Sequence, residues 1–147
     1  MYLGIMLMVL VVVLVVVLTI AIVNSKIHNA GYYYNRGLEY YEQENYDKAI
    51  ADWTQAIKIN PNNDMAYYNR GLAYYLQENY NKAIADYTQA IKINPNDESA
   101  YNNRGTAYLN QWYYDKAIAD YTQAIKINPN YKDAVNNLAL ARRMRGW

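Results

Sequence analysis

Between residues 30 and 131, apolar and polar positions alternate with the period of amphipathic helices. In the first part of this region, Tyr33, Gly37 and Tyr40 follow the i, i+3/i+4, i+7 spacing of one helix face. After a polar turn the same spacing returns in a second series, which comprises Tyr46, Ala49, Ile50, Trp53, Ala56 and Ile57. The pattern predicts two helices joined by a turn, and Pro61 ends the second helix because proline cannot continue it.

This helical hairpin occurs three times with a period of 34 residues. Asn-Arg-Gly recurs at 35–37, 69–71 and 103–105, and Ile-Asn-Pro recurs at 59–61, 93–95 and 127–129. A fixed period of this size indicates a stacked repeat, in which each unit contacts mainly its neighbours and the stack builds an extended concave surface. The repeat therefore predicts an all-α solenoid whose function is binding. Asn63, which follows the first Ile-Asn-Pro, is expected to cap the next helix.

Small and charged residues recur in the same phase. Each first helix has a glycine, and each second helix has an alanine 12 residues later, so these small residues are expected to face each other where the helices cross; the pairs are Gly37 and Ala49, Gly71 and Ala83, and Gly105 and Ala117. Lysine and aspartate stand four residues apart on the second helices, at Lys48 and Asp52, Lys82 and Asp86, and Lys116 and Asp120. This spacing predicts weak ion pairs on a solvated face.

The unit resembles the tetratricopeptide repeat, whose 34-residue pattern runs from an aromatic through Leu-Gly, Tyr, Ala, an aromatic and Ala to Pro. The resemblance implies a right-handed α-solenoid of three hairpins at 30–63, 64–97 and 98–131, followed by a capping helix at 132–147. The matching residues are Tyr33, Gly37, Tyr40, Ala49, Trp53, Ala56 and Pro61; Tyr67, Gly71, Tyr74, Ala83, Tyr87, Ala90 and Pro95; and Tyr101, Gly105, Tyr108, Ala117, Tyr121, Ala124 and Pro129.

The chain departs from the family pattern at two places. An arginine precedes each glycine where the family has leucine. Glu44, Glu78 and Trp112 stand where the family often has glycine at the hairpin turn. Asn45 and Asn79 are expected to compensate by taking the left-handed conformation, which asparagine adopts more readily than most residues. The third turn has no such asparagine, so its shape is expected to differ.

In tetratricopeptide domains the first helix of each unit lines a groove in which partner peptides lie. Carried onto this chain, the resemblance implies a partner-binding groove formed by Tyr34, Asn35, Leu38, Tyr41, Met65, Tyr68, Asn69, Leu72, Tyr75, Leu76, Ser99, Asn102, Asn103, Thr106 and Leu109. One asparagine per unit forms a ladder, at Asn35, Asn69, Asn103 and Asn137. These amides could hold the backbone of an extended peptide, or they could form hydrogen bonds within the stack.

One subfamily grips the C-terminal carboxylate of chaperones with lysines, asparagines and an arginine in this groove. Asn69 matches that clamp, but Tyr34, Leu38, Ser99 and Asn103 occupy its other positions. We therefore expect no such clamp, and a protein or peptide partner that is recognised by apolar and aromatic contacts.

Residues 2–23 differ from the rest of the chain because none of them carries a charged side chain. Twenty-two helical residues span about 33 Å, and the hydrocarbon core of a bilayer is about 30 Å thick. Valine and isoleucine favour strands in water, but in lipid the backbone must satisfy its own hydrogen bonds, which leaves a helix. Residues 1–23 are therefore predicted to be a transmembrane anchor, or an uncleaved signal, that contacts the membrane through residues 2–23 and precedes a short link at 24–29.

A cleaved signal peptide is the alternative interpretation of this segment. Signal peptides usually have an apolar stretch of about 7–15 residues with positive charge before it, whereas this stretch is longer and no basic side chain precedes it. Retention makes the chain a single-pass membrane protein, and Lys26 then favours a cytoplasmic repeat domain by the positive-inside rule. Cleavage would instead leave a secreted or periplasmic binding module.

Composition narrows the chemistry further. Lys plus Arg is 14 and Asp plus Glu is 13, which gives a net charge of +1 and no basic excess for nucleic acid. There is no cysteine, and His28 is the single histidine, so neither a thiol nor a histidine-based metal site or dyad is expected. No phosphate loop or nucleophile elbow is found. The sequence therefore predicts a non-enzymatic protein without catalytic residues, metal or cofactor: a membrane-anchored interaction scaffold or, alternatively, a structural self-association unit.

Overall fold

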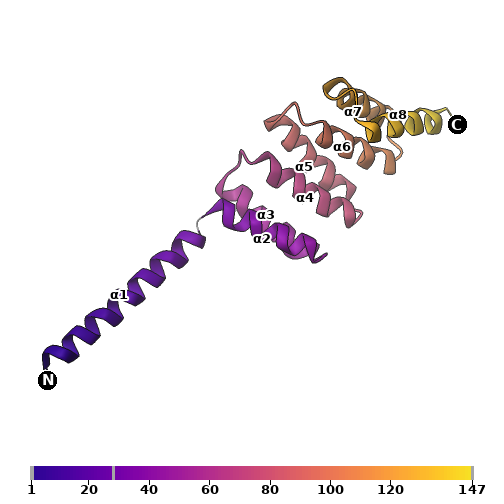
Figure 1. The fold of residues 1–147 in the computed structure, drawn as a ribbon. Helices are drawn as coiled ribbons and strands as arrows, with labels where there is room; N and C mark the ends of the chain where they lie inside the picture. The colour runs from indigo at the N-terminus through magenta and orange to yellow at the C-terminus, as the bar shows by residue number, and fades with distance from the viewer. Residues whose placement is uncertain (1, 28, 147) are drawn as a thin grey trace.

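The computed structural model describes residues 2–27 and 29–146, and these residues form an all-α structure without strands. Figure 1 shows the helices in order along the chain. Their bounds are α1 (Tyr2–Ile27), α2 (Ala30–Glu42), α3 (Tyr46–Ile59), α4 (Asp64–Leu76), α5 (Tyr80–Ile93), α6 (Glu98–Asn110), α7 (Tyr114–Ile127) and α8 (Lys132–Arg145). The predicted all-α solenoid is confirmed.

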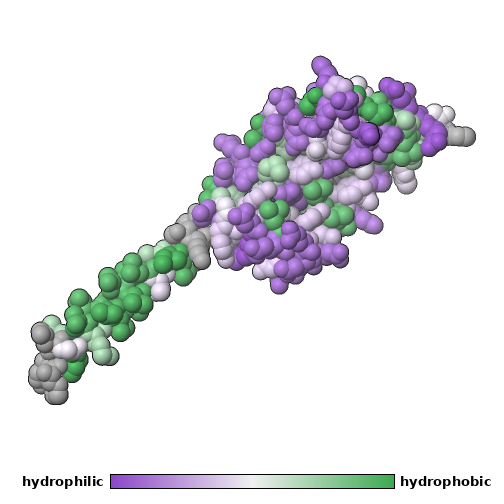
Figure 2. All heavy atoms as spheres, viewed as in Figure 1, coloured by the Kyte–Doolittle hydropathy of each residue, from purple (hydrophilic) through white to green (hydrophobic). Residues whose placement is uncertain are grey.

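Helix α1 extends away from the other helices (Figure 1) and is almost uniformly apolar on the surface seen in Figure 2. Every residue from 4 to 23 is exposed, although the mean hydropathy of this stretch is 3.5. The helix continues past Val23 to Ile27, so helical structure covers much of the segment expected to be a link. His28 lies outside the described residues. The stack buries none of residues 4–23, and the length and composition of this stretch suit a bilayer.

Helices α2 to α8 stack as antiparallel hairpins (Figure 1). Within each unit the first helix packs on the second, as α2 on α3, α4 on α5 and α6 on α7. Each second helix also packs on the first helix of the next unit, and α8 closes the stack against α7 and α6. Helix α8 thus stands where the first helix of a fourth unit would stand, as a terminal solenoid element should.

The core of each unit is one large aromatic ring under a glycine. Trp53, Tyr87 and Tyr121 are 0% exposed. A Cβ atom added to Gly71 would lie 2.9 Å from Cε1 of Tyr87, which is closer than packed atoms tolerate. The atoms nearest to each glycine belong to the aromatic ring of the second helix, and the expectation that the glycines face the alanines stays a prediction. The glycine is needed so that the first helix can lie directly on the ring.

The three hairpin turns share one backbone geometry. Glu44, Glu78 and Trp112 have φ values of 56°, 58° and 61°, in the left-handed region. In the third turn the amide of Trp112 donates to Leu109 O at 2.9 Å, and the first turn has the equivalent bond from Glu44 to Tyr41. The expectations that Asn45 and Asn79 would take the left-handed conformation, and that the third turn would differ, were wrong. The position itself requires positive φ, whichever residue occupies it.

The first helix of each unit begins with a side-chain cap. The Asn63 side chain accepts a hydrogen bond from the amide of Ala66 at 3.0 Å, so the predicted cap of α4 is confirmed. Asp97 does the same for α6 by accepting from Ala100 at 3.0 Å. These caps satisfy amides that have no partner inside the helix. They fix where each unit begins and therefore how its first helix meets the one before it.

Candidate functional site

The first helices of successive units lie side by side and form one face of the stack, which we call the first-helix face (α2, α4, α6 and α8). Hydrogen bonds between residues 35 positions apart join them across this face. These bonds run from Asn69 Nδ2 to Tyr34 Oη at 3.0 Å, from Asn103 Nδ2 to Tyr68 Oη at 2.9 Å, from Asn110 Nδ2 to Tyr75 Oη at 2.8 Å and from Asn137 Nδ2 to Asn102 Oδ1 at 3.1 Å. The face is therefore a continuous surface with a fixed register between units.

This network decides between the two interpretations of the asparagine ladder. Asn69, Asn103 and Asn137 each donate to the preceding unit, so hydrogen bonding within the stack is confirmed for these three. Asn35, at the start of the ladder, is exposed. The side-chain amides of the ladder therefore hold the units in register, and a bound peptide would meet a wall whose polar groups are already largely paired.

The residues predicted to line the groove differ in how far they reach solvent. Asn35, Met65 and Leu76 are exposed, whereas Asn69 and Asn102 are buried, at 9% and 6% exposure. The others are half-buried: Tyr34, Leu38, Tyr41, Tyr68, Leu72, Tyr75, Ser99, Asn103, Thr106 and Leu109. Several of these also pack on the core, such as Tyr34, Leu38 and Tyr41 on the cluster around Trp53. The groove assignment itself stays a prediction.

Arginine and aspartate form a bidentate ion pair inside every unit. In the second unit, Nε and Nη2 of Arg70 donate to the two carboxylate oxygens of Asp86, each at 2.7 Å. The same geometry joins Arg36 to Asp52 and Arg104 to Asp120. The interpretation of these aspartates as a solvated face paired with lysine was wrong, because their side chains are buried and their partners lie on the first helix, 16 residues earlier.

The arginines also connect one unit to the next. Nη1 of Arg70 donates to Thr54 of the preceding unit at 2.9 Å, and Nη1 of Arg104 donates to Thr88 at 3.1 Å. Burial lowers the pKa of Arg70 and Arg104, but the hydrogen bond and the charge of the paired aspartate outweigh burial and raise the pKa overall. These guanidinium groups are therefore permanently charged, and each of their three nitrogens donates a hydrogen bond.

The lysines of the second helices lie over tyrosine rings. The Nζ atoms of Lys48, Lys82 and Lys116 are 5.3, 5.1 and 5.3 Å from the ring centroids of Tyr40, Tyr74 and Tyr108. This distance permits a cation–π contact. None of the predicted groove residues is a lysine or arginine. The arginines of each unit are paired with aspartates, and these lysines lie over rings. The predicted groove residues on α2, α4 and α6 thus offer aromatic, apolar and amide groups in place of positive charge.

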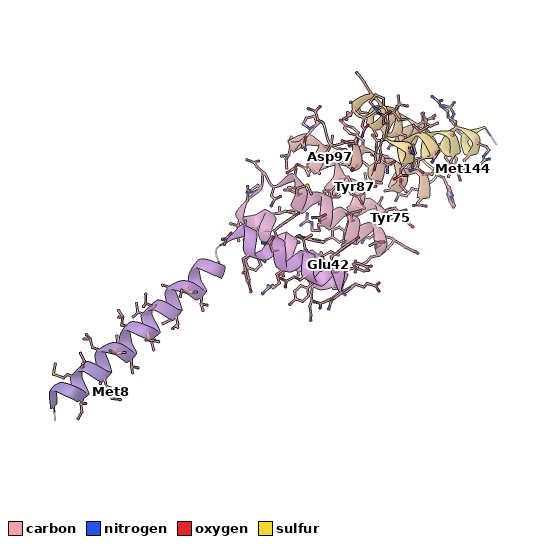
Figure 3. All side chains as sticks on the ribbon, in the orientation of Figure 1. Met8, Glu42, Tyr75, Tyr87, Asp97 and Met144 are labelled. Carbon is pink, nitrogen blue, oxygen red and sulfur yellow. The ribbon has the colours of Figure 1, made fainter. Side chains whose placement is uncertain are left out.

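A small pocket of about 70 Å³ opens between α4 and α6. Leu72 and Tyr75 of α4 form one wall, Asn103 and Thr106 of α6 form the other, and Tyr87 of α5 lies at the base. Figure 3 labels Tyr75 and Tyr87 on these neighbouring helices. Burial raises the pKa of Tyr87, which keeps its hydroxyl neutral.

The sequence missed Tyr87 as a residue of this site because it lies on a second helix. The four wall residues had all been predicted, since they follow the first-helix spacing. A signal was present in the repeats: Leu72 and Thr106 occupy equivalent positions 34 residues apart, so the ring beneath each has a different neighbour.

The chemistry of metal sites gives no further candidate, because the described residues contain no cluster of three or more acidic or histidine side chains.

Sequence comparison identifies the repeats. Three models of the tetratricopeptide repeat family match, a TPR repeat at residues 37–78 and Tetratricopeptide repeats at 65–97 and 98–131. Together they span 37–131 without a break. No curated protein matches the chain.

Solved structures resemble the stack closely. The first TPR of Spaghetti (RPAP3) bound to the HSP90 peptide SRMEEVD has a TM-score of 0.79 and 26% identity, covering 82% of this chain and 96% of that one. The Arabidopsis OM64 TPR domain has a TM-score of 0.76 and 29% identity, covering 80% and 98%. MamA has a TM-score of 0.81 and 25% identity, covering 86% and 74%. The architecture of α2 to α8 is therefore the one these domains share.

Proposed function

Because the chain contains tetratricopeptide repeats over residues 37–131, we propose that it is a membrane-anchored interaction scaffold that binds a protein or peptide partner on its first-helix face. The observation that carries the proposal is the continuous surface of α2, α4, α6 and α8, held in register by hydrogen bonds between units. The similar domain of Spaghetti was solved with a peptide bound, which supports peptide binding by this architecture. The chain acts by holding its partner and is not an enzyme.

The partner we propose is an extended segment with apolar and aromatic side chains and little negative charge. Met65 and Leu76 expose 45% and 46% of their surface on α4, and the tyrosines beside them present rings. An acidic peptide would need cations, and the arginines of every unit are paired with buried aspartates. The HSP90 peptide SRMEEVD, which the domain of Spaghetti binds, is therefore expected to bind this chain poorly.

The anchor is proposed from α1. Residues 4–23 are apolar and exposed, with a mean hydropathy of 3.5, and 20 helical residues span about 30 Å, the thickness of the hydrocarbon core. A chain tethered in this way meets partners on the same membrane at a raised effective concentration. Lys26 favours a cytoplasmic repeat domain. Cleavage of the segment, giving a secreted or periplasmic module, is the alternative.

Membrane extraction separates these alternatives. Cells expressing the full chain are fractionated, and the membranes are washed in alkaline carbonate. A retained anchor keeps the chain in the pellet at the full mass of 17.1 kDa, and protease added to sealed vesicles reports which side carries the repeats. A shortened chain in the soluble fraction would contradict the anchor while leaving the binding face untouched.

Peptide selection tests the binding face directly. The full chain in lipid nanodiscs is presented with a displayed library of random peptides, and enriched sequences are expected to be apolar and aromatic. Leu76→Glu and Met65→Glu should each abolish capture. Ile59→Glu is the matched control, because Ile59 is an apolar residue of similar exposure, 41%, on a second helix. Loss of capture in the control, or enrichment of acidic peptides such as SRMEEVD, would contradict the proposal.

A self-association unit is the remaining alternative for this surface. It predicts that the full chain in nanodiscs pairs with a second copy through the same residues. Light scattering at several concentrations measures the mass of the wild type and of Leu76→Glu. A self-association unit should show a larger mass for the wild type than for Leu76→Glu, whereas a scaffold for peptides should show the same mass for both.

A further inference from the structure

The three units place equivalent aromatic residues in their cores, but the polar atoms of these residues differ in whether they have a hydrogen-bond partner. Trp53 Nε1 donates to the backbone oxygen of Tyr34 at 3.2 Å, and Tyr121 Oη donates to Thr106 Oγ1 at 3.2 Å. Tyr87 Oη is the one buried side-chain polar atom among the described residues that has no hydrogen-bond partner. A buried hydroxyl without a partner costs free energy, so this position requires an explanation.

The Tyr87 hydroxyl lacks a partner because the repeats differ at one position. Thr106 receives the Tyr121 hydroxyl in the third unit, and the equivalent position in the second unit is Leu72, whose side chain has no polar atom. The Tyr87 side chain is 0% exposed and its hydroxyl is buried, and the residue borders the pocket between α4 and α6. The residue that carries the unpaired hydroxyl therefore borders a space between the first helices α4 and α6.

The other polar side chains of this pocket each have a hydrogen-bond partner, and Tyr75 Oη accepts from Asn110 Nδ2 at 2.8 Å. Thr106 Oγ1 donates to Asn102 O at 3.0 Å and accepts from Tyr121. Asn103 Nδ2 donates to Tyr68 Oη at 2.9 Å, and its Oδ1 accepts from Asn102. Leu72 adds an apolar wall. The hydroxyl of Tyr87, which can both donate and accept, is thus the polar group of this pocket that has no partner at all.

We propose that this pocket is a specificity subsite that receives one short, neutral, hydrogen-bonding side chain of the bound partner, such as serine, threonine or asparagine, through the hydroxyl of Tyr87. As a subsite of the binding face, it rests on the proposed function above. The partner side chain would supply the hydrogen bond that Thr106 supplies in the next unit.

Size and charge restrict the occupant. The volume of about 70 Å³ is roughly half of the ~150 Å³ that holds a benzene ring, so aromatic side chains are excluded. A carboxylate is excluded because Arg70 and Arg104 are bound to Asp86 and Asp120, which leaves no cation to compensate its burial. A purely apolar occupant would leave the hydroxyl unpaired in a now drier site.

Acetamide probes the pocket without any peptide. The full chain in detergent micelles, labelled for NMR, is titrated with acetamide and separately with acetate, which has the same shape and a negative charge. Acetamide should shift the signals of Leu72, Asn103 and Thr106, and acetate should not. Tyr87→Phe should weaken acetamide binding about three- to tenfold, the loss of one hydrogen bond.

A second variant supplies the missing partner internally. Leu72→Thr reproduces in the second unit the threonine that pairs with Tyr121 in the third, so it should abolish the acetamide shifts while leaving the fold intact. Melting temperature gives a further readout: Tyr87→Phe should raise Tm in the absence of ligand, because the unpaired hydroxyl is removed, and Tyr121→Phe should lower it.

The outcomes separate this subsite from the proposed function. Three results would overturn the subsite even where peptides are still selected. They are equal acetamide binding by wild type and Tyr87→Phe, no acetamide binding at all, and a Tm that falls in Tyr87→Phe as it does in Tyr121→Phe. Acetamide binding by the wild type that Tyr87→Phe weakens, together with a library that yields no peptide, supports the subsite and contradicts the proposed function instead.

Discussion

The Asp86→Ala variant tests the ion pair that the structure places inside each unit. Asp86 and Arg70 are 7% and 16% exposed, so removing the carboxylate leaves a guanidinium in a site from which water is largely excluded. Breaking a buried pair in this way costs about 3–5 kcal/mol. Because a domain of this size has about 5–15 kcal/mol of total stability, this variant should unfold at a much lower urea concentration.

A double-mutant cycle separates the two candidate partners of Asp86. Arg70→Leu restores the family's usual leucine, and Lys82→Met removes the lysine four residues earlier. The coupling energy of Asp86 with Arg70 should be about 2–3 kcal/mol, as for groups in direct contact. Its coupling with Lys82 should be below about 0.5 kcal/mol, the range of helix-surface pairs. Urea unfolding of the full chain in mild detergent, followed by circular dichroism, gives each free energy.

The first unit provides an internal comparison. Arg36 is 35% exposed, roughly twice as much as Arg70, although its hydrogen bonds to Asp52 are equally short. Water can therefore solvate Arg36 when its partner is removed, and Asp52→Ala should cost less than Asp86→Ala. A larger coupling of Asp86 with Lys82 than with Arg70 would refute the reasoning, as would equal losses in the two units.

Three further predictions concern the turn, the helix crossing and pH. Trp112→Gly should stabilise the chain by about 0.5–1 kcal/mol in urea unfolding, because glycine relieves the left-handed strain at φ 61° and the indole is 75% exposed; a loss of stability would contradict this. Gly71→Leu should cost at least about 2 kcal/mol in the same assay, since its Cβ alone would lie 2.9 Å from the Tyr87 ring, and a neutral result would contradict the packing. Burial raises the pKa of Tyr68 and Tyr121 to about 12, and burial also raises the pKa of Tyr87 above its ordinary value. Raised folded-state values stabilise the chain below pH 10, and this contribution is lost as the pH rises from about 10 to about 12. Tyrosinate absorbance should show these three of the 19 tyrosines ionising late, and ionisation of all 19 together near pH 10 in the folded chain would refute it.

The sequence predicted those parts of the fold that depend on neighbouring residues. Helical spacing, the proline stops and the cap at Asn63 are local, and the 34-residue period carries them through the stack. The Arg–Asp pairs could not be found in this way, because Asp86 meets Arg70 across a hairpin while Lys82 stands at helix-pairing distance in the sequence. The left-handed turns were misassigned for a similar reason: residue preference favoured Asn45, but the hairpin geometry imposed positive φ on Glu44.

For the candidate site, the first-helix residues followed from the resemblance, but their roles did not. Whether the Asn69 amide faces solvent or a neighbouring tyrosine depends on where the previous unit lies. Tyr87 belongs to the site only because Leu72 fails to pair with it, which is a property of two helices together. Neither relation can be read from one helix alone.

The three repeats differ more in their first helices than in their second helices. Residues 48–52 and 54–62 of the second helices and their ends recur unchanged in all three units, whereas the first helices vary at several positions. The constant residues include the aspartates and the buried alanines of the core. One variable position holds Leu38, Leu72 and Thr106 and lies against the core aromatic of its unit. The second helices therefore provide a uniform frame, and differences along the first-helix face give each unit its own contacts. A partner that lies across this face would meet a different surface at each unit, so its orientation and register would be determined by the variable positions.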